Sequence, residues 1–424
     1  AWFAYYANRL ASPFYYWGNW VVVGLFFLLY ITFCRIYDGF LFSTMRISEL
    51  VYSQALAALI SNGILYVVIC LLSKRFANPL PLFLVVAADV VLSAAWAFCS
   101  HQWYFARFPA SRSAVVYDAR EGLERLVREY GLEKKFKIYV AMTIQQALAN
   151  KEDLASMETV FLSGIHSHDR NILLKYCVEH DITVYVIPRI GDVLMSGAHA
   201  MHLFHLPMLR VGRYHPSPIY LLLKRGFDIL ASGLATILLS PVFIGTAIAI
   251  KSHDHGPVFY KQKRLTKDGK VFEVLKFRSM RVDAEKDGVA RLSTGDNDDR
   301  ITPVGRFIRK VRIDELPQLL NILKGDMTIC GPRPERPEIA EQYEQELPEF
   351  RLRLQAKAGL TGYAQVYGKY NTTPYDKLMM DLMYIAHPSF WQDLQIMFAT
   401  VKILFMREST AGIAAGQTTA VNDK

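Results

Sequence analysis

Two deficiencies of this 424-residue chain exclude the disulfide-stabilised and the disordered classes of protein. Its five cysteines are odd in number and scattered, so they indicate neither a disulfide framework nor a thiolate zinc site. Charged residues make up only 21% of the chain and hydrophobic residues 52%, which excludes intrinsic disorder and argues against an ordinary water-soluble globule. The cysteine usage also indicates soluble parts that face a reducing cytosol.

Charge is scarcest in residues 1–110, which contain six Lys or Arg and three Asp or Glu. Three apolar runs there approach or reach the roughly 20 residues that a helix needs to cross a bilayer. Because there are several, we predict spans rather than a cleavable signal peptide. The opening Ala-Trp-Phe-Ala-Tyr-Tyr has no methionine and is typical of the aromatic end of a further span, so we expect four spans in all. The three runs are Trp20–Ile36, Val51–Leu72 and Leu80–Phe98.

Short β-branched runs alternate with helical patterns in residues 111–212. This alternation is typical of a small parallel α/β domain. A dinucleotide-binding fold needs three glycines after its first strand, where backbone must approach a pyrophosphate, and the segment Tyr117–Gly122 has one. Nucleotide binding is therefore not the favoured interpretation of this domain. The expected strands are Ala114–Tyr117, Lys137–Val140, Thr159–Leu162 and Thr183–Ile187.

A further apolar segment, Gly226–Ile250, has the length of a membrane helix and carries one charge, Asp228. Its centre contains Ser240 and Pro241, and the proline removes a backbone hydrogen bond, so we predict a kink there. The segment is either an ordinary kinked span or a re-entrant helix that enters and leaves by one face. The re-entrant alternative keeps the domains before and after it on the same side of the membrane.

The region that follows, residues 251–336, is rich in positive charge, with 19 Lys or Arg against 13 Asp or Glu. Diffuse binding to anionic lipid is the usual meaning of such charge beside a membrane. Here the cations are grouped in compact motifs, among them Lys276–Met280 and Gly331–Glu335. Two prolines around Arg333 restrict its backbone, which suits a guanidinium aimed at a phosphate. The pattern indicates a specific phosphate ligand, and nothing in it suggests nucleic acid.

The adjacent carboxylates Asp314 and Glu315 lie among these cations. Leucine spacing predicts one helix over 312–325, with Pro317 in its first turn, Gly325 after its end and both carboxylates at its positive pole. A plain N-cap with a solvated neighbour is the alternative. Paired carboxylates suit Mg²⁺ held together with substrate phosphates, and a carboxylate can also attack phosphorus itself. The residues alone thus indicate phosphoryl or phosphoglycosyl transfer at a membrane surface.

The run from Lys224 to about Arg407 resembles the bacterial sugar transferases called monotopic phosphoglycosyl transferases, in particular the large branch with an N-terminal span bundle and a degenerate nucleotide-fold domain. Six motifs occur in the family's order. Two departures concern the last of them, where Ala358 and Tyr363 stand in place of a frequent proline and tryptophan. The motifs are Lys224-Arg225 with Phe227-Asp228, Ser240-Pro241, Lys276–Met280, Asp314–Gln318, Gly331–Glu335, and Gly359–Gly362 running into Ala364–Val366.

The resemblance implies a reaction in which a sugar 1-phosphate passes from a UDP-sugar to undecaprenyl phosphate. Asp314 is then the nucleophile that takes the phosphosugar with loss of UMP, Glu315 completes the dyad, and Mg²⁺ is held by these carboxylates and the diphosphate. Lys276, Arg278 and Arg333 then neutralise the negative charge that develops on the oxygens of the transferred phosphate. Gln365 either faces the nucleobase or belongs to a buried structural loop.

The resemblance also implies the fold class and the location. We expect a membrane protein of α plus α/β class, with the re-entrant helix at about 224–251 broken at Ser240 and Pro241. We expect it in the bacterial cytoplasmic membrane, in contact with lipid and with its catalytic domain on the cytosolic face. It is expected to be a homodimer. Its reaction would be the first membrane step of capsule, exopolysaccharide or O-antigen synthesis. The expected domains are a span bundle over 1–110, a degenerate Rossmann-like domain over 111–212 with a structural or regulatory role, a catalytic domain over 220–408 and a flexible tail over 409–424.

Two alternatives stay open at this point. One is a membrane-anchored regulatory or scaffold protein whose transferase domain is inactive, although the intact Asp314, Glu315 and Arg333 argue against it. The other is an enzyme that works by direct displacement, in which the two carboxylates only hold metal. A covalent adduct on Asp314 distinguishes the last alternative from the double-displacement reaction.

Overall fold

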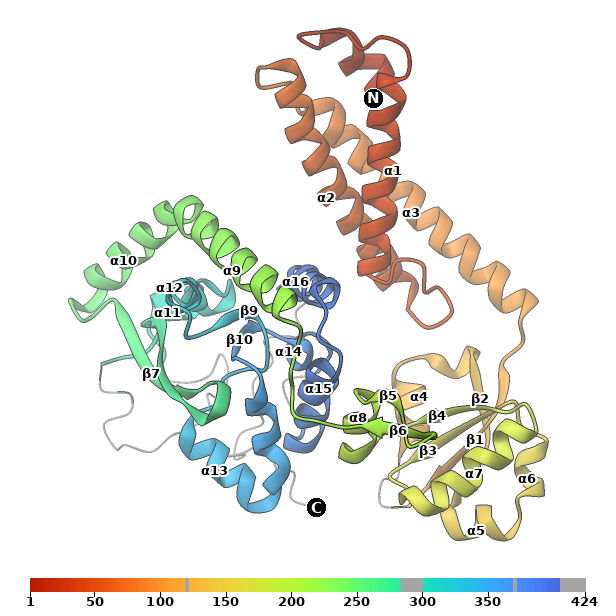
Figure 1. Ribbon diagram of the computed structural model, residues 1–424. Helices are drawn as coiled ribbons and strands as arrows, with labels where there is room; N and C mark the ends of the chain where they lie inside the picture. The colour runs from red at the N-terminus through yellow and green to blue at the C-terminus, as the bar shows by residue number, and fades with distance from the viewer. Residues whose placement is uncertain (119–121, 283, 285–299, 369–371, 405–424) are drawn as a thin grey trace. The chain divides into compact units, whose positions relative to one another are not determined.

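The computed structural model describes residues 1–118, 122–282, 284, 300–368 and 372–404. The chain divides into two compact units, Ala1–Pro188 and Arg189–Lys424 (Figure 1). The predicted tail at 409–424 and half of the segment Tyr117–Gly122 discussed for nucleotide binding lie outside the described residues.

Long apolar helices open the first unit, and they confirm the three predicted spans. The described residues contain three helices long and apolar enough to cross a membrane. Two short helical segments, η1 (Trp2–Tyr6) and η2 (Ala7–Arg9), come before them and pack into a cluster with apolar side chains from the later helices, including Leu65 and Ile69. The three long helices are α1 (Gly18–Ile36), α2 (Ile47–Ser73) and α3 (Leu80–Arg107).

A four-stranded parallel sheet in the order β2-β1-β3-β4 forms the rest of the first unit and confirms the predicted parallel α/β arrangement. β-Branched and aliphatic side chains on these strands, such as Val116, Val160 and Leu162, are fully or almost fully buried beneath the helices. The elements are β1 (Ser111–Tyr117), α4 (Leu123–Glu129), η3 (Leu132–Lys134), β2 (Phe136–Thr143), α5 (Ile144–Ala149), α6 (Glu152–Ala155), β3 (Thr159–Ser163), α7 (Ser167–Glu179) and β4 (Thr183–Val186).

The second unit begins at Arg189, earlier than the domain boundary at 212 expected from the sequence. Its first helix, α8 (Ile190–Ser196), buries Val193 in a cluster with apolar residues of α15 (Pro374–Ala386). The antiparallel hairpin of β5 (His199–Leu203) and β6 (Leu206–Arg210) follows. Packing of side chains distant in sequence sets this boundary, which local composition does not report.

The apolar segment after the hairpin is bent, as the sequence predicted. It forms α9 (Pro218–Leu238) and α10 (Ser240–Asp254), and the helix axis bends by 59° between them (Figure 1). Pro241 lies in the first turn of α10, where its missing N–H costs no helical hydrogen bond. The hydroxyl of Ser240 donates to the carbonyl of Ile237 at 2.7 Å and so satisfies one carbonyl at the end of α9.

Short strands and helices complete the second unit beside this bent pair. The antiparallel strands β7 (Phe259–Leu265) and β8 (Val271–Phe277) form one ribbon, and the parallel strands β9 (Thr328–Cys330) and β10 (Gly359–Thr361) form another. The remaining elements are η4 (Lys267–Gly269), α11 (Pro303–Lys310), η6 (Ile313–Glu315), α12 (Gln318–Lys324), α13 (Pro337–Glu346), η7 (Pro348–Gln355), α14 (Tyr363–Tyr367) and α16 (Phe390–Leu404).

The single helix predicted over 312–325 is instead two elements. Arg312 adopts a left-handed backbone with φ of 58°, the turn η6 follows it, and α12 starts after Pro317. A helix starts readily after a proline, because proline has no N–H to donate to an earlier turn. Gly325, with φ of 99°, ends α12 as predicted.

Candidate functional site

The site is built around Glu315, the last residue of the turn η6. Its Oε1 lies 3.2 Å from Nζ of Lys276, near the end of β8, and 3.2 Å from a guanidinium nitrogen of Arg333, after β9. Its Oε2 lies 4.0 Å from Arg312. The structure thus brings together two of the three predicted phosphate-binding cations around one carboxylate.

Apolar contacts hold the two carboxylates at this place. Ile313 and Leu316, the residues on either side of Asp314 and Glu315, pack against a buried cluster from α10, β8 and α11. The cluster ties the end of the bent helix pair to the turn that carries the carboxylates. Its buried members are Ile250, Phe277 and Ile308.

Asp314 differs from its neighbour because it makes no hydrogen bond or ion pair with any residue that the structure describes. Burial and then the negative charge of Glu315 raise the pKa of Asp314 to about 6, against the opposing effect of Lys276, Arg309 and Arg312. An unpaired carboxylate with a raised pKa is more basic than an ordinary aspartate and remains ionised at neutral pH.

Glu315 titrates in the opposite direction. Burial raises its pKa, but the positive charges of Lys276, Arg333 and Arg312 outweigh burial and hold the pKa of Glu315 well below its ordinary value. Burial lowers the pKa of Lys276, against the charge of Glu315. The adjacent carboxylates therefore have separate properties: Glu315 is a fixed anion that anchors cations, and Asp314 is available to a ligand.

A second charged cluster, which sequence reasoning missed, fixes the loop that carries Arg333. Glu335 lies two residues later and accepts a hydrogen bond of 2.7 Å from Lys377. It also lies 3.7 Å from Arg353 and 3.8 Å from Arg264. Burial raises the pKa of Glu335, but these three cations dominate and lower it to about 2. The only sequence signal was the place of Glu335 in the Gly331–Glu335 motif.

Arg353 connects this cluster directly to Arg333. Its guanidinium donates to the backbone carbonyl of Arg333 at 2.8 Å and pairs with Asp381 at 2.6 Å. The side chains of Arg353 and Asp381 are 2% and 1% exposed, so the pair is shielded from solvent. This shielded pair holds the backbone of Arg333 in place. The side chain of Arg333 itself is 38% exposed.

Helix α9 is hydrogen-bonded to the elements around the site. Arg225 donates to the carbonyls of Ile322 and Leu323 at 2.6 and 2.8 Å, at the end of α12 where carbonyls lack helical partners. Asp228, 4% exposed, accepts hydrogen bonds from the Thr328 hydroxyl and the Ile329 amide at 2.7 and 3.0 Å. The charge in the middle of the apolar segment is therefore satisfied by β9.

Lys224 forms a further buried contact of α9. Its ammonium group lies 2.7 Å from the carboxylate of Asp393 in α16, which also accepts hydrogen bonds from the hydroxyls of Tyr220 and Tyr384. The Lys224 and Asp393 side chains are 13% and 4% exposed. The Lys224-Arg225 and Phe227-Asp228 motif thus acts here as an attachment of the bent pair, through three separate polar contacts.

Two predicted site residues lie apart from Glu315. Arg278 pairs with Asp254 at the end of α10 and donates to the carbonyl of Pro257 at 2.7 Å, with its side chain 7% exposed. Gln365 donates to the carbonyl of Leu360 at 3.1 Å, which places its amide nitrogen within its own loop. The structure does not bring either side chain to the two carboxylates.

The carboxylate of Asp314 fits Mg²⁺ that is bound together with substrate phosphates. The described residues contain no group of three or more His, Cys, Asp or Glu side chains able to hold a metal. Mg²⁺ is typically bound through one or two carboxylates plus substrate phosphates. Asp314 offers such a carboxylate, whereas both oxygens of Glu315 face cations.

Comparison with known proteins bears on the second unit. The family described as bacterial sugar transferase matches residues 219–407, a range that includes the bent helix pair, both carboxylates and both charged clusters. The chain spans about half the length of two curated relatives that it matches.

Three relatives illustrate the similarity. A UDP-N-acetylgalactosamine-undecaprenyl-phosphate N-acetylgalactosaminephosphotransferase of Aeromonas hydrophila is 40% identical over 234 residues, 54% of each chain. A UDP-glucose:undecaprenyl-phosphate glucose-1-phosphate transferase of Escherichia coli K12 is 41% identical over 212 residues, 49% of this chain and 44% of that one. A protein of the same name from Caulobacter vibrioides is 40% identical over 206 residues, 47% of this chain and 76% of that one.

Proposed function

Since this chain belongs to the bacterial sugar transferase family, we propose that it transfers a sugar 1-phosphate from a UDP-sugar to undecaprenyl phosphate and releases UMP. The relatives' names support this substrate pair, and they also name different sugars. The proposal therefore concerns the class of donor, a UDP-hexose or UDP-N-acetylhexosamine, and the class of acceptor, a polyprenyl phosphate.

The contrast between two neighbouring carboxylates is the observation that carries the proposal. Glu315 is held by Lys276 and Arg333, while Asp314 has no partner among the described residues and a pKa raised to about 6. One fixed anion beside one available anion is the arrangement that a nucleophile with a charged support requires.

In the first half of the reaction, an oxygen of Asp314 attacks the phosphorus that carries the sugar. The new bond joins that oxygen to phosphorus, and the bond from phosphorus to UMP breaks with its electron pair leaving on UMP. Arg333 is exposed enough to meet the substrate, and with Lys276 it supplies positive charge where the phosphoryl oxygens gain negative charge. Glu315 keeps these two cations in position throughout.

In the second half, an oxygen of the polyprenyl phosphate attacks the same phosphorus. The bond to Asp314 breaks, the carboxylate is restored, and the product is a polyprenyl diphosphate sugar. Asp314 is a good leaving group for this step because a carboxylate is a weak base. When bound, Mg²⁺ would be held by Asp314 together with substrate phosphate, and it would supply positive charge that neutralises the donor diphosphate.

The membrane arrangement that fits this reaction is a re-entrant α9–α10 pair. Two features support it: α9 is bonded through Arg225 in its first half and Asp228 at its middle, and α10 near its end through Ile250 and Asp254, all to elements of one compact unit. Both ends of a bent pair held by one body lie on one face of a bilayer. We place that face on the cytosolic side of the bacterial cytoplasmic membrane, where nucleotide sugars are available.

The transfer would begin the assembly of a capsule, exopolysaccharide or O-antigen on the polyprenyl carrier. The homodimer expected from the sequence stays a prediction and takes no part in the argument for the reaction.

Release of UMP from a panel of UDP-sugars tests the proposal. The full chain would be held in nanodiscs with Mg²⁺, with and without undecaprenyl phosphate. We expect sustained release that requires the polyprenyl phosphate and favours one sugar, and a phosphosugar adduct on Asp314 when the acceptor is omitted. The adduct would be located by mass spectrometry of peptides.

Each other outcome points to a definite alternative. Turnover without any adduct would favour direct displacement, in which the carboxylates only hold metal. Absence of UMP release from every donor, with the protein still folded, would favour the regulatory or scaffold interpretation.

A further inference from the structure

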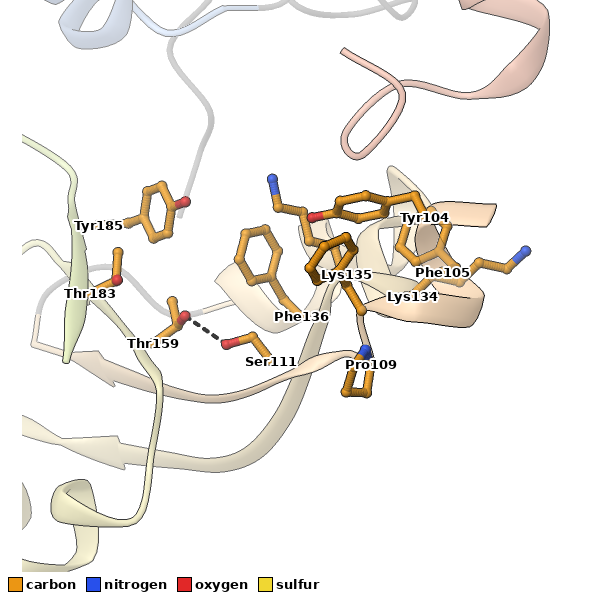
Figure 2. A pocket seen from close by; sticks show the side chains of 11 residues that line it. Tyr104, Phe105, Pro109, Ser111, Lys134, Lys135, Phe136, Thr159, Thr183 and Tyr185 are labelled. Carbon is orange, nitrogen blue, oxygen red and sulfur yellow. Dashed lines mark hydrogen bonds between the residues drawn. The ribbon is translucent and has the colours of Figure 1, made fainter. Parts of the chain in front are cut away.

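The first unit contains a cavity of about 170 Å³ at one edge of its parallel sheet. Ser111, Thr159 and Thr183 line it from the first residues of β1, β3 and β4, so the cavity lies at the amino edge (Figure 2). Ligands of open parallel sheets usually bind at the carboxyl edge. The cavity is therefore in a different place from a nucleotide site of this kind of fold.

The chain connects this edge of the sheet directly to the apolar helix α3. The apolar helix α3 ends at Arg107 and β1 begins at Ser111, with three residues between them. Three extended residues span at most about 11 Å. Tyr104, Phe105 and Phe108, from the end of α3, complete the cavity wall, and aromatic residues are typical of the headgroup level of a bilayer.

The loop between α1 and α2 also contacts the α/β part of the first unit, next to the cavity. Nζ of Lys135 donates to the hydroxyl of Ser43 at 3.2 Å, and the guanidinium of Arg46 donates to the carbonyl of Glu129 at 2.7 Å. These bonds join the loop to the α/β part of the same unit. The cavity thus lies where the span bundle and the sheet meet.

The cavity lining is rich in donors and carries positive charge. It contains Lys134, Lys135 and hydroxyl groups, and none of the lining residues is an Asp or Glu. Lys135 is half-buried and forms no ion pair with any residue that the structure describes. Burial lowers its pKa, as expected for an ammonium group without a nearby anion.

Two hydroxyl groups of the lining have defined positions. The hydroxyls of Ser111 and Thr159 are hydrogen-bonded to each other at 2.8 Å (Figure 2). The ring of Tyr185 stacks on Phe161 and meets Phe136 edge-on, with ring centroids 5.1 and 5.6 Å apart. Ordered hydroxyls and an unpaired ammonium group are donors for the oxygens of a phosphate.

We propose that this cavity binds the phosphate of an anionic phospholipid headgroup, with Lys135 as its ion-pair partner. A cavity of about 170 Å³ is smaller than the roughly 300 to 1,000 Å³ of sites that enclose a whole drug-sized ligand. It matches a small charged group whose remaining part lies outside, as the acyl chains of a lipid do. Binding there would fasten the sheet to the membrane surface independently of the transferase reaction.

Native mass spectrometry of the full chain tests the proposal. The protein would be released from nanodiscs of equal parts phosphatidylcholine and phosphatidylglycerol, and the retained lipids identified and counted. We expect the wild type to retain phosphatidylglycerol selectively. Lys135→Gln should reduce that retention roughly tenfold, because a charge-assisted hydrogen bond is lost, while Lys135→Arg should preserve most of it.

Two further variants complete the design. Lys137→Gln removes an exposed lysine two positions later, in β2, so its retention should equal that of the wild type and control for net charge. Thr183→Val removes one exposed cavity hydroxyl at nearly constant shape and should reduce retention roughly threefold. This second variant keeps the test decisive should Lys135→Gln not fold.

Three results would overturn the proposal. They are equal retention by Lys135→Gln and the wild type, equal retention of both lipids by the wild type, and displacement of the lipid by millimolar glycerol phosphate. The last result would assign the site to a soluble phosphate compound in place of a lipid.

Discussion

The ammonium group of Lys276 lies 3.2 Å from a carboxylate oxygen of Glu315, 39 positions later in the chain. The same oxygen is 3.2 Å from Arg333, so one anion positions two cations. Asp314, its neighbour in the same turn, is left without a partner among the described residues. The division of labour between the two carboxylates follows from this difference in surroundings.

Asp314→Asn should abolish sustained UMP release, by roughly 10³-fold or more, because an amide cannot form the acyl phosphate. The fold should be kept, since Asp314 makes no hydrogen bond within the described structure. The measurement is UMP release in nanodiscs, with thermal unfolding as the check on folding. Glu341→Gln, at an exposed position of α13, is the matched control and should keep wild-type rates. Normal turnover by a folded Asn variant would falsify the nucleophile assignment.

The rate of UMP release should fall as pH falls through about 6, because Asp314 must be ionised and its pKa is raised to about 6. Glu315→Gln should move this acidic limb to lower pH, since the negative charge of Glu315 is one cause of the raised pKa and the cations it neutralises would then act on Asp314. The same variant should lower the rate at neutral pH roughly 10²-fold, because Lys276 and Arg333 lose their anchor. A limb that stays in place in Glu315→Gln would contradict the coupling.

Glu335→Gln should destabilise the second unit by about 3 kcal/mol, because three cations lose a shielded partner. The pKa of Glu335 is lowered from 4.5, the ordinary value for a glutamate, to about 2, so the unfolded chain binds more protons between these values. Stability from Glu335 is therefore complete above about pH 4.5 and is lost as pH falls toward 2.

Unfolding in detergent at several pH values measures this effect. The gap between Glu335→Gln and the wild type should be large at pH 7 and should close in acid. Glu338→Gln, an exposed position in the first turn of α13, is the control and should change little. A gap that does not depend on pH would show that the loss comes from packing and not from charge.

A re-entrant α9–α10 pair predicts that its two flanks face the same side of the membrane. His215→Cys and Lys270→Cys place thiols at exposed positions before α9 and after α10. In a Cys99→Ser background, an impermeant maleimide should label both positions in inside-out vesicles and neither in intact spheroplasts. Labelling of the two positions from opposite sides would mean that the pair crosses the bilayer.

Local features of this protein followed from its sequence alone. Span length depends on a run of apolar residues, and the break at Ser240 and Pro241 depends on a proline that a continuous helix would not accommodate, so both could be predicted and both are present. The parallel α/β arrangement followed from alternating patterns in the same way. The cationic motifs and the adjacent carboxylates could also be recognised in the sequence. Lys276 and Arg333 from these motifs contact Glu315 in the site.

Only the tertiary structure decided which charges meet. Arg278 belongs to a motif predicted to bind phosphate, but it pairs with Asp254. Glu335 contacts three cations from separate segments, Arg264, Arg353 and Lys377. Ion pairs act over a few ångströms in space, whatever the separation along the chain, so composition and spacing do not report them. The sequence determined which chemical groups were present, and packing determined that Glu315 is neutralised while Asp314 stays available, because burial and neighbouring charge set the pKa of each carboxylate.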